Sequence, residues 1–548
     1  MAHHRQPPSR AAQQQNTFFG GAAILAVGIF VVKIIGMFYK IPLLNIIGEE
    51  GSADFTNAYN IYAVLLTIST AGLPVAVSKL VSEANALGRK RQVDKIFQLS
   101  LIAFILLGTI SFLVMYFGAE QMAALMKDSM AAPGIRALSP AVICVGCLAA
   151  LRGYDQGHSR MTSTSISQII EALCKLVVGL ALAAYVMSLT FTTTAVQTSQ
   201  AAAGAITGVT VGTVVALVYM VISFLLHRAK APYGGNDRSD SARNILSTLL
   251  KIAIPITLSS SMVGIVTLID SALVQGQLQN ALGLSENASR ALYGNYAGAL
   301  NIYNLPTSLM AAITASVIPA VSAALTRRNA SAAAKISASA LRITALVSFP
   351  MGIGLFVLGT PIIQLLFPGL SVEVAGPLLS TLGLATPFVC MMLVCNSVLQ
   401  AHGFVTLPVL VMLLGGVVKI VNNYNLVAQI GISGAPVGNI LCFGLCLLLD
   451  LIIIARVIPN RPRYAPIFLK PLLAAGLTGG AAWAVYGLLF RVLADGQTNA
   501  AGDLVHTISR MGNAVAVYLA LIVALRAISR DDLALMPKGE RLARLLKL

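Results

Sequence analysis

The chain has 548 residues, of which 57% are hydrophobic and only 10% are charged, and its mean hydropathy is +0.82. Because about a quarter of the residues of a soluble protein are charged, this composition excludes an ordinary soluble globular protein. The formal net charge is +17, but the basic residues gather in alternate segments between apolar runs, such as Arg89-Lys90-Arg91. That distribution follows membrane topology and does not indicate a nucleic-acid partner.

Apolar runs of membrane-spanning length recur along the whole chain. About 20 apolar residues cross about 30 Å of hydrocarbon as a helix. The sequence therefore predicts an all-α integral membrane protein with about 14 transmembrane helices, at residues 20–44, 57–80, 96–118, 136–151, 163–189, 201–226, 247–272, 292–322, 340–366, 376–399, 405–428, 434–456, 467–490 and 512–529.

The polar segments between these runs predict the orientation of the chain. Lys and Arg are abundant in the segments that follow every second span, whereas the loop at residues 45–56 contains neither. Since basic segments stay in the cytoplasm, both termini are expected there. Residues 1–17 are expected to form a disordered cytoplasmic tail, and residues 530–548 a basic cytoplasmic tail.

The first apolar run, at residues 18–48, carries Lys33 and Lys40, one heptad apart. Seven residues of α-helix turn through about 700°, which places the two ammonium groups on nearly one face. A lysine at bilayer depth costs about 2.5 kcal/mol or more, so it normally faces protein or a wet cavity. The two lysines therefore predict a binding site for an anion within the membrane.

Further charged residues lie within or beside the predicted spans. Lys79 lies at a membrane edge, where it either binds lipid head groups or lines a cavity. Glu171 and Lys175 are four residues apart on one predicted helix, so they either pair with one another or line the cavity. Asp270 is a candidate for proton or cation coupling, with an interfacial cap as the alternative.

The span at 292–322 begins with a polar side that includes Asn301 and Tyr303. Amide and hydroxyl groups of this kind suit hydrogen bonds to a saccharide or a lipid head group. They can equally satisfy one another between packed helices, and the sequence leaves both interpretations open.

An internal repeat relates the two halves of the chain. Lys175 recurs as Lys419, and His158 recurs as His402 at the same interval. Because each copy holds six spans, the repeat is parallel, and a substrate site is expected between the copies. The sequence predicts two six-helix lobes at residues 18–228 and 246–458, a cytoplasmic linker at 229–245, and two further helices within 459–529.

The sequence predicts neither a metal site nor a cofactor. All seven cysteines fall in apolar spans, where they are expected to be small buried residues. Acid/base enzymes of membranes carry clusters of acidic residues or histidines in sizeable aqueous loops. The short loops here indicate a transporter and not an enzyme.

Several stretches resemble a known group of transporters: LRGYDQGHSRMTSTSISQIIEALCKLVVG at residues 151–179, GLPVAVSKLVSE, SVIPAVSAAL, VVKIVNNYNLV and RDDLALMPKGERL. The chain resembles the polysaccharide-exporter branch of the superfamily that contains the multidrug and toxin extrusion transporters. Within it, the chain is similar to the stage V sporulation protein B group and to lipid II flippases of the MurJ type. The resemblance implies a V-shaped bundle of fourteen helices in the bacterial plasma membrane, which moves pyrophosphate-linked saccharides to the outer leaflet.

The resemblance also implies roles for particular residues. Lys33 matches an arginine position of the lipid II flippases, and Lys40 stands one residue past a second such position. Asn301 stands where those flippases carry an arginine, and their second helix has no basic counterpart here except Lys79, lower down. By the same comparison, Asp270 and Asn422 are candidates for ion coupling.

The function predicted from these observations is a flippase for an undecaprenyl-pyrophosphate-linked cell-wall precursor, above all lipid II. Its partners would be this lipid-linked oligosaccharide and the membrane lipids, and its energy would come from sodium, protons or the membrane potential. The alternatives are a cation-coupled multidrug exporter of the same superfamily and a flippase for another lipid-linked polysaccharide unit.

Overall fold

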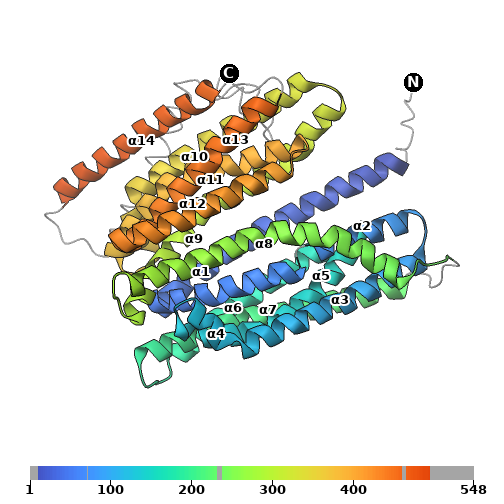
Figure 1. Ribbon diagram of the computed structural model, residues 1–548, viewed down its shortest axis with the longest axis horizontal. Helices are drawn as coiled ribbons and strands as arrows, with labels where there is room; N and C mark the ends of the chain where they lie inside the picture. Colours follow the sequence, from blue (N-terminus) through green and yellow to red (C-terminus); the bar gives the residue numbers. More distant parts are fainter. Residues whose placement is uncertain (1–9, 71, 159, 231–236, 459–463, 494–548) are drawn as a thin grey trace. The chain divides into compact units, whose positions relative to one another are not determined.

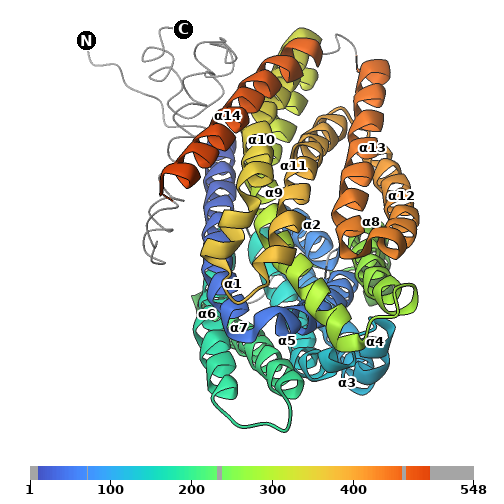
Figure 2. The same ribbon diagram turned by 90° about the vertical axis from the view of Figure 1, so that its left-hand side faces the viewer.

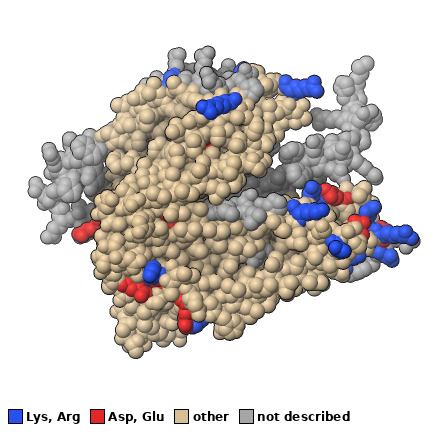
Figure 3. Space-filling view, in the orientation of Figure 1, with Lys and Arg blue, Asp and Glu red and all other residues tan. Residues whose placement is uncertain are grey.

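The computed structural model describes residues 10–70, 72–158, 160–230, 237–458 and 464–493. The described chain consists of α-helices and two short 3-10 helices and contains no strand, which confirms the all-α prediction (Figure 1). Eight of its segments are long and apolar enough to cross a membrane, and two of these, Val27–Ala86 and Thr406–Val457, each contain more than one helix. Figure 3 shows a face formed largely by uncharged residues, with the charged side chains near its margins.

Packing divides the chain into two compact units, Met1–Ala272 and Leu273–Leu548. The boundary lies inside helix α8 (Ala242–Asn280), whereas the sequence places the linker between two lobes at residues 229–245. The two-lobe repeat itself stays a prediction.

The first unit contains seven helices and the larger part of α8. Helix α6 packs along α7, and α5 packs against both α3 and α7 (Figures 1 and 2). These elements are α1 (Arg10–Thr70), α2 (Leu73–Ala86), α3 (Lys90–Phe117), α4 (Ala119–Leu125), η1 (Ser129–Ala131), α5 (Ala132–Gly157), α6 (Met161–Met187) and α7 (Thr194–Lys230).

Helix α1 comprises two helices that meet at a kink at Gly48, so the two predicted spans follow one another directly and are not joined by a loop at residues 45–56. The backbone stays helical through this segment except at Gly48, where φ is 66° and ψ is −167°. Glycine adopts such a positive φ without the steric cost that a Cβ would bring. Beyond Gly48 the segment is not a solvated loop, because Phe55, Ala58 and Tyr62 enter the core of the unit. Helix α1 also begins at Arg10, inside the predicted tail at residues 1–17.

The described part of the second unit contains the end of α8, six further α-helices and one short 3-10 helix. Helix α11 is largely buried because α9, α10 and α13 pack around it. These elements are α9 (Glu286–Thr326), α10 (Ala330–Leu366), α11 (Val372–Ala401), α12 (Thr406–Ile430), η2 (Gly431–Ser433), α13 (Gly434–Val457) and α14 (Tyr464–Leu493). The predicted span at 512–529 and the tail at 530–548 lie outside the described residues.

Candidate functional site

Two lysines of the first unit lie against aromatic rings. The Nζ atom of Lys40, on α1, lies 4.2 Å from the ring centroid of Phe55. The Nζ atom of Lys175, on α6, lies 4.9 Å from the ring centroid of Tyr39 and 5.0 Å from that of Tyr59. Rings attract ammonium groups through their negative faces. We call these five residues the lysine–aromatic cluster.

The rings of this cluster come from both parts of α1, before and after Gly48. Phe55 stacks on Tyr59 with 6.0 Å between centroids, and Tyr39 is tilted against Phe55 at 6.2 Å. The Tyr39 hydroxyl donates a hydrogen bond to the backbone oxygen of Ala205 on α7, at 3.2 Å. Phe55 and Tyr59 are one helical turn apart, so the α1 sequence places them on the same face.

Neither lysine of the cluster is neutralised by a carboxylate of the described chain. Among the described residues, no carboxylate lies within ion-pair distance of Lys40 or Lys175. The two ammonium groups are close enough to repel one another. Two cations held at half-buried positions without a counter-ion attract an anion much more strongly than they would in bulk water.

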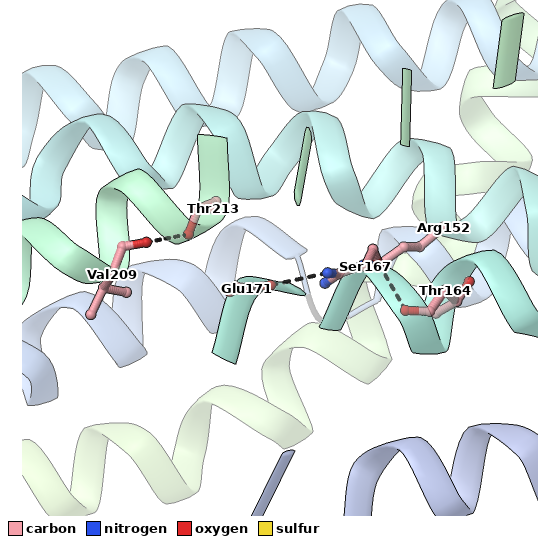
Figure 4. A network of polar contacts seen from close by, with 6 residues as sticks. All are labelled: Arg152, Thr164, Ser167, Glu171, Val209 and Thr213. Carbon is pink, nitrogen blue, oxygen red and sulfur yellow. Dashed lines mark hydrogen bonds and ion pairs between the residues drawn. The ribbon is translucent and has the colours of Figure 1, made fainter. Parts of the chain in front are cut away.

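Glu171 lies on the same helix as Lys175 but pairs with a different cation. Its Oε2 atom is 3.0 Å from a terminal nitrogen of Arg152 on α5 (Figure 4). The Nε atom of Arg152 also donates to the Ser167 hydroxyl at 3.0 Å, and that hydroxyl donates to the backbone oxygen of Thr164. The predicted pairing of Glu171 with Lys175 is therefore replaced by an ion pair between α5 and α6.

The other two lysines predicted to bind substrate lie elsewhere. Lys33 on α1 and Lys79 on α2 are exposed side chains, and neither has an ion pair or a cation–π contact among the described residues. The structure places Lys175 and Lys40 against neighbouring rings of α1, and the predicted site formed by Lys33 and Lys40 stays a prediction. A role for Lys33 and Lys79 in binding stays a prediction.

The predicted site residues of the second unit make few contacts with one another. The Asn301 amide donates to the backbone oxygen of Ala297 at 3.0 Å, and the Asn422 amide donates to that of Val418 at 2.9 Å. The Tyr303 hydroxyl is buried and has no hydrogen-bond partner among the described residues. Lys419 lies half-buried on α12.

Asp270, the predicted ion-coupling carboxylate, is buried on α8 with 6% of its surface exposed. The neighbouring Ser271 hydroxyl accepts a hydrogen bond from the Asn60 amide of α1 at 3.1 Å. The coupling role of Asp270 stays a prediction. Among the described residues, no group of three or more His, Cys, Asp or Glu side chains could hold a metal ion.

Tyr39, Phe55 and Tyr59 are not among the site residues predicted from the sequence. The sequence does carry a signal for them, because Phe55 and Tyr59 have helical spacing and Tyr39 adjoins Lys40. The loop predicted at residues 45–56, however, separates Phe55 from the first helix.

Solved structures of transporters share this fold. A structure described as lipid II flippase MurJ in an inward closed conformation matches with a TM-score of 0.67 at 15% identity, covering 92% of this chain and 99% of that one. An inward-facing multidrug resistance MATE family transporter of the MOP superfamily matches with a TM-score of 0.63 at 15% identity, covering 79% of this chain and 98% of that one.

Curated proteins of Bacillus subtilis (strain 168) are similar over most of their length. The membrane protein YabM is 24% identical over 533 residues, which cover 96% of each chain. Lipid II flippase MurJ is 24% identical, covering 80% of this chain and 82% of its own. Stage V sporulation protein B is 23% identical, covering 94% of this chain and 97% of its own.

Two family models match the sequence. The MatE model matches residues 294–425. The model described as polysaccharide biosynthesis protein matches residues 18–325, which is more than half of the chain. This multi-pass membrane protein therefore belongs to the polysaccharide biosynthesis protein family, with the fold of the MOP superfamily flippases and transporters.

Proposed function

We propose that this chain is a flippase that moves an undecaprenyl-pyrophosphate-linked cell-wall saccharide precursor, with lipid II as the first candidate. The precursor moves from the inner to the outer leaflet of the bacterial plasma membrane, and both termini of the protein lie in the cytoplasm. The observation that carries the proposal is the pair of un-neutralised lysines, Lys40 and Lys175, held against the rings of Phe55, Tyr39 and Tyr59.

A pyrophosphate supplies the counter-ion that the lysine–aromatic cluster lacks. Its negative charges offset the repulsion between the two ammonium groups, so the bound anion and the two cations stabilise one another. The polyprenyl tail can stay in the bilayer while the head group crosses. An inside-negative potential assists the outward movement of an anion by about 2.3 kcal/mol per charge per 100 mV.

The relatives support this class of substrate. One curated relative and one solved structure carry the name lipid II flippase, and both cover at least four-fifths of this chain. The cation pair Lys40 and Lys175 is this chain's own arrangement, and the electrostatic argument for an anionic head group rests on it.

The second candidate function is cation-coupled export of drugs, as the MATE name of one structural neighbour suggests. The observation that favours it is the buried carboxyl of Asp270. Cationic drugs, however, would be repelled by Lys40 and Lys175, so the lysine–aromatic cluster favours the flippase.

The experiment is reconstitution of the full chain in liposomes with lipid II and measurement of its exposure at the far leaflet. We expect the double variant Lys40→Gln/Lys175→Gln to lower the rate at least tenfold, which corresponds to about 1.4 kcal/mol of lost stabilisation. The control is Lys335→Gln on α10, an exposed lysine in the other unit, which should leave the rate unchanged.

The outcomes separate the candidates. Wild-type flipping by the double variant would overturn the role of the two lysines. Transport of another undecaprenyl-pyrophosphate-linked saccharide but not of lipid II would reassign the head group and keep the site. Export of a cationic drug without any lipid flipping would favour the second function.

A further inference from the structure

Helix α13 carries a buried carboxyl group that makes no hydrogen bond within the described part of the chain. Asp450 is fully buried, and neither of its carboxyl oxygens has a hydrogen-bond partner among the described residues. No Lys, Arg or His of the described chain lies within ion-pair distance of it. Each of the other described buried aspartates has an ion pair or another polar interaction; Asp155, for example, pairs with Arg160 at 2.9 Å.

The surroundings of Asp450 are apolar. On its own face of α13 the neighbouring turns carry Cys446, Leu447 and Ile454, which are all buried. Helix α11 packs against α13, and Leu447 and Ile454 share one hydrophobic cluster with Met391, Val394, Cys395 and Val398 of α11.

The titratable groups around Asp450 do not supply a positive charge. Those that interact with it electrostatically are the thiols of Cys395 on α11 and Cys446 on α13. Lys419 on α12, and Glu373 and His402 at the two ends of α11, form no hydrogen bond or ion pair with it.

Such a site disfavours a charge on the carboxyl. Moving a carboxylate out of water without a cation or a donor costs several kcal/mol, whereas the neutral acid loses much less. The packing of α13 described here is therefore compatible with the protonated form. To lose its proton the group must meet water, which requires α13 to separate from α11.

We propose that Asp450 is a proton-binding site of the second unit, occupied in the packing seen here and vacated when α13 opens to water. The two protonation states then favour two packings of α11 against α13. Asp450 lies outside the residues that either family model matches, 18–325 and 294–425. The inference does not depend on which substrate the protein carries.

The first test is infrared spectroscopy of the purified full chain in liposomes. We expect a C=O band of a protonated carboxylic acid at neutral pH that disappears in Asp450→Asn. The control Glu373→Gln, an exposed carboxylate on the first turn of α11, should keep the band. A band that is absent from the wild type, or that persists unchanged in Asp450→Asn, would overturn the proposal.

The second test follows the opening through native thiols and needs no substrate. At about pH 9 we expect Cys395 and Cys446 to react with a thiol reagent at least about fivefold faster in the wild type than in Asp450→Asn, because only the wild type gains a buried charge. Cys174, on α6 of the other unit, corrects for the general rise of thiolate with pH.

Equal reactivity in both proteins would contradict the coupling of protonation to opening. Asn resembles the neutral acid in shape, so the variant should fold and unfold at nearly the wild-type temperature. Failure of Asp450→Asn to fold would mean that the native structure requires the carboxylate, and that would also overturn the proposal.

Discussion

The guanidinium of Arg152 on α5 and the carboxylate of Glu171 on α6 form an ion pair of 3.0 Å, one turn away from Lys175. This pair uses the carboxylate that would otherwise be available to Lys175. In the described part of the chain, Lys175 therefore has no counter-ion, which is the basis of the proposed anion binding. The pair also joins α5 to α6, the helix that carries Lys175 of the lysine–aromatic cluster.

The Arg152–Glu171 pair should matter more for stability than an exposed pair. We expect Glu171→Gln to lower the free energy of unfolding by about 1 kcal/mol, because the Arg152 side chain, which is 14% exposed, loses its counter-ion. The measurement is thermal or denaturant unfolding in detergent. Its matched control is Glu120→Gln. The ion pair of Glu120 with Arg136 is shorter, at 2.7 Å, but the two side chains are 71% and 46% exposed. Equal effects of the two variants would contradict the argument from burial.

The long helices could be predicted from the sequence because length and apolarity determine them. Residues 376–399 were expected and α11 is Val372–Ala401, and residues 434–456 were expected and α13 is Gly434–Val457. The partner of Glu171 could not be predicted. Spacing on one helix pointed to Lys175, whereas Arg152 reaches Glu171 only through the packing of α5 near α6.

The lysine–aromatic cluster was predictable in part. The cost of a charge at bilayer depth marks Lys40 and Lys175 as unusual residues, but nothing in the sequence shows that a second helix follows the kink at Gly48 directly. A glycine followed by two acidic residues is typical of a loop. Burial of Phe55 and Tyr62 stabilises the helix beyond the break, and that burial depends on contacts distant in sequence.

The ring of Tyr59 should hold the ammonium group of Lys175. We expect Tyr59→Leu to raise the rate at which an amine reagent labels Lys175 by about threefold, because a cation–π contact contributes about 0.5–2 kcal/mol. Tyr59→Phe keeps the ring and should leave the labelling rate unchanged. The rates can be measured by mass spectrometry of the Lys175 peptide. Labelling that rises equally in both variants would assign the effect to the hydroxyl.

Hydrogen bonds to Asp237 should hold the polar segment before α8 against the start of α3. The carboxylate of Asp237 accepts hydrogen bonds from the backbone N–H groups of Arg91 and Gln92, both at 3.1 Å. Desolvation opposes ionisation, but these hydrogen bonds outweigh it and lower the pKa of Asp237. We expect hydrogen exchange at the amides of Arg91 and Gln92, corrected for their intrinsic rates, to be faster in Asp237→Ala than in the wild type.

The lowered pKa of Asp237 also gives the sign of the pH dependence. An unfolded Asp has a pKa of about 3.9. The stabilising contribution of ionised Asp237 is therefore fully present above about pH 4, and it is lost as the pH falls through the lower pKa that Asp237 has in the folded protein. Acidification of the wild type should therefore reproduce the exchange seen in Asp237→Ala. The control is Arg238→Ala, an exposed neighbour. Unchanged exchange at the two amides in acid would contradict the assignment.

The contact of α10 with α11 should depend on glycine. A Cβ on Gly383 would lie 2.6 Å from the backbone nitrogen of Phe356 and 2.7 Å from the backbone oxygen of Gly352, so Gly383→Ala must push the two backbones apart. Overpacking of this kind costs about 1–3 kcal/mol.

The control is Gly354→Ala, on the same helix as Gly352, because a Cβ added there meets no atom within 4 Å. It should be neutral or stabilising by about 0.5–1 kcal/mol, because alanine loses less entropy than glycine in a helix. Unfolding temperatures of the two variants measure the difference, and a Gly383→Ala protein as stable as Gly354→Ala would show that the helices can separate at no cost.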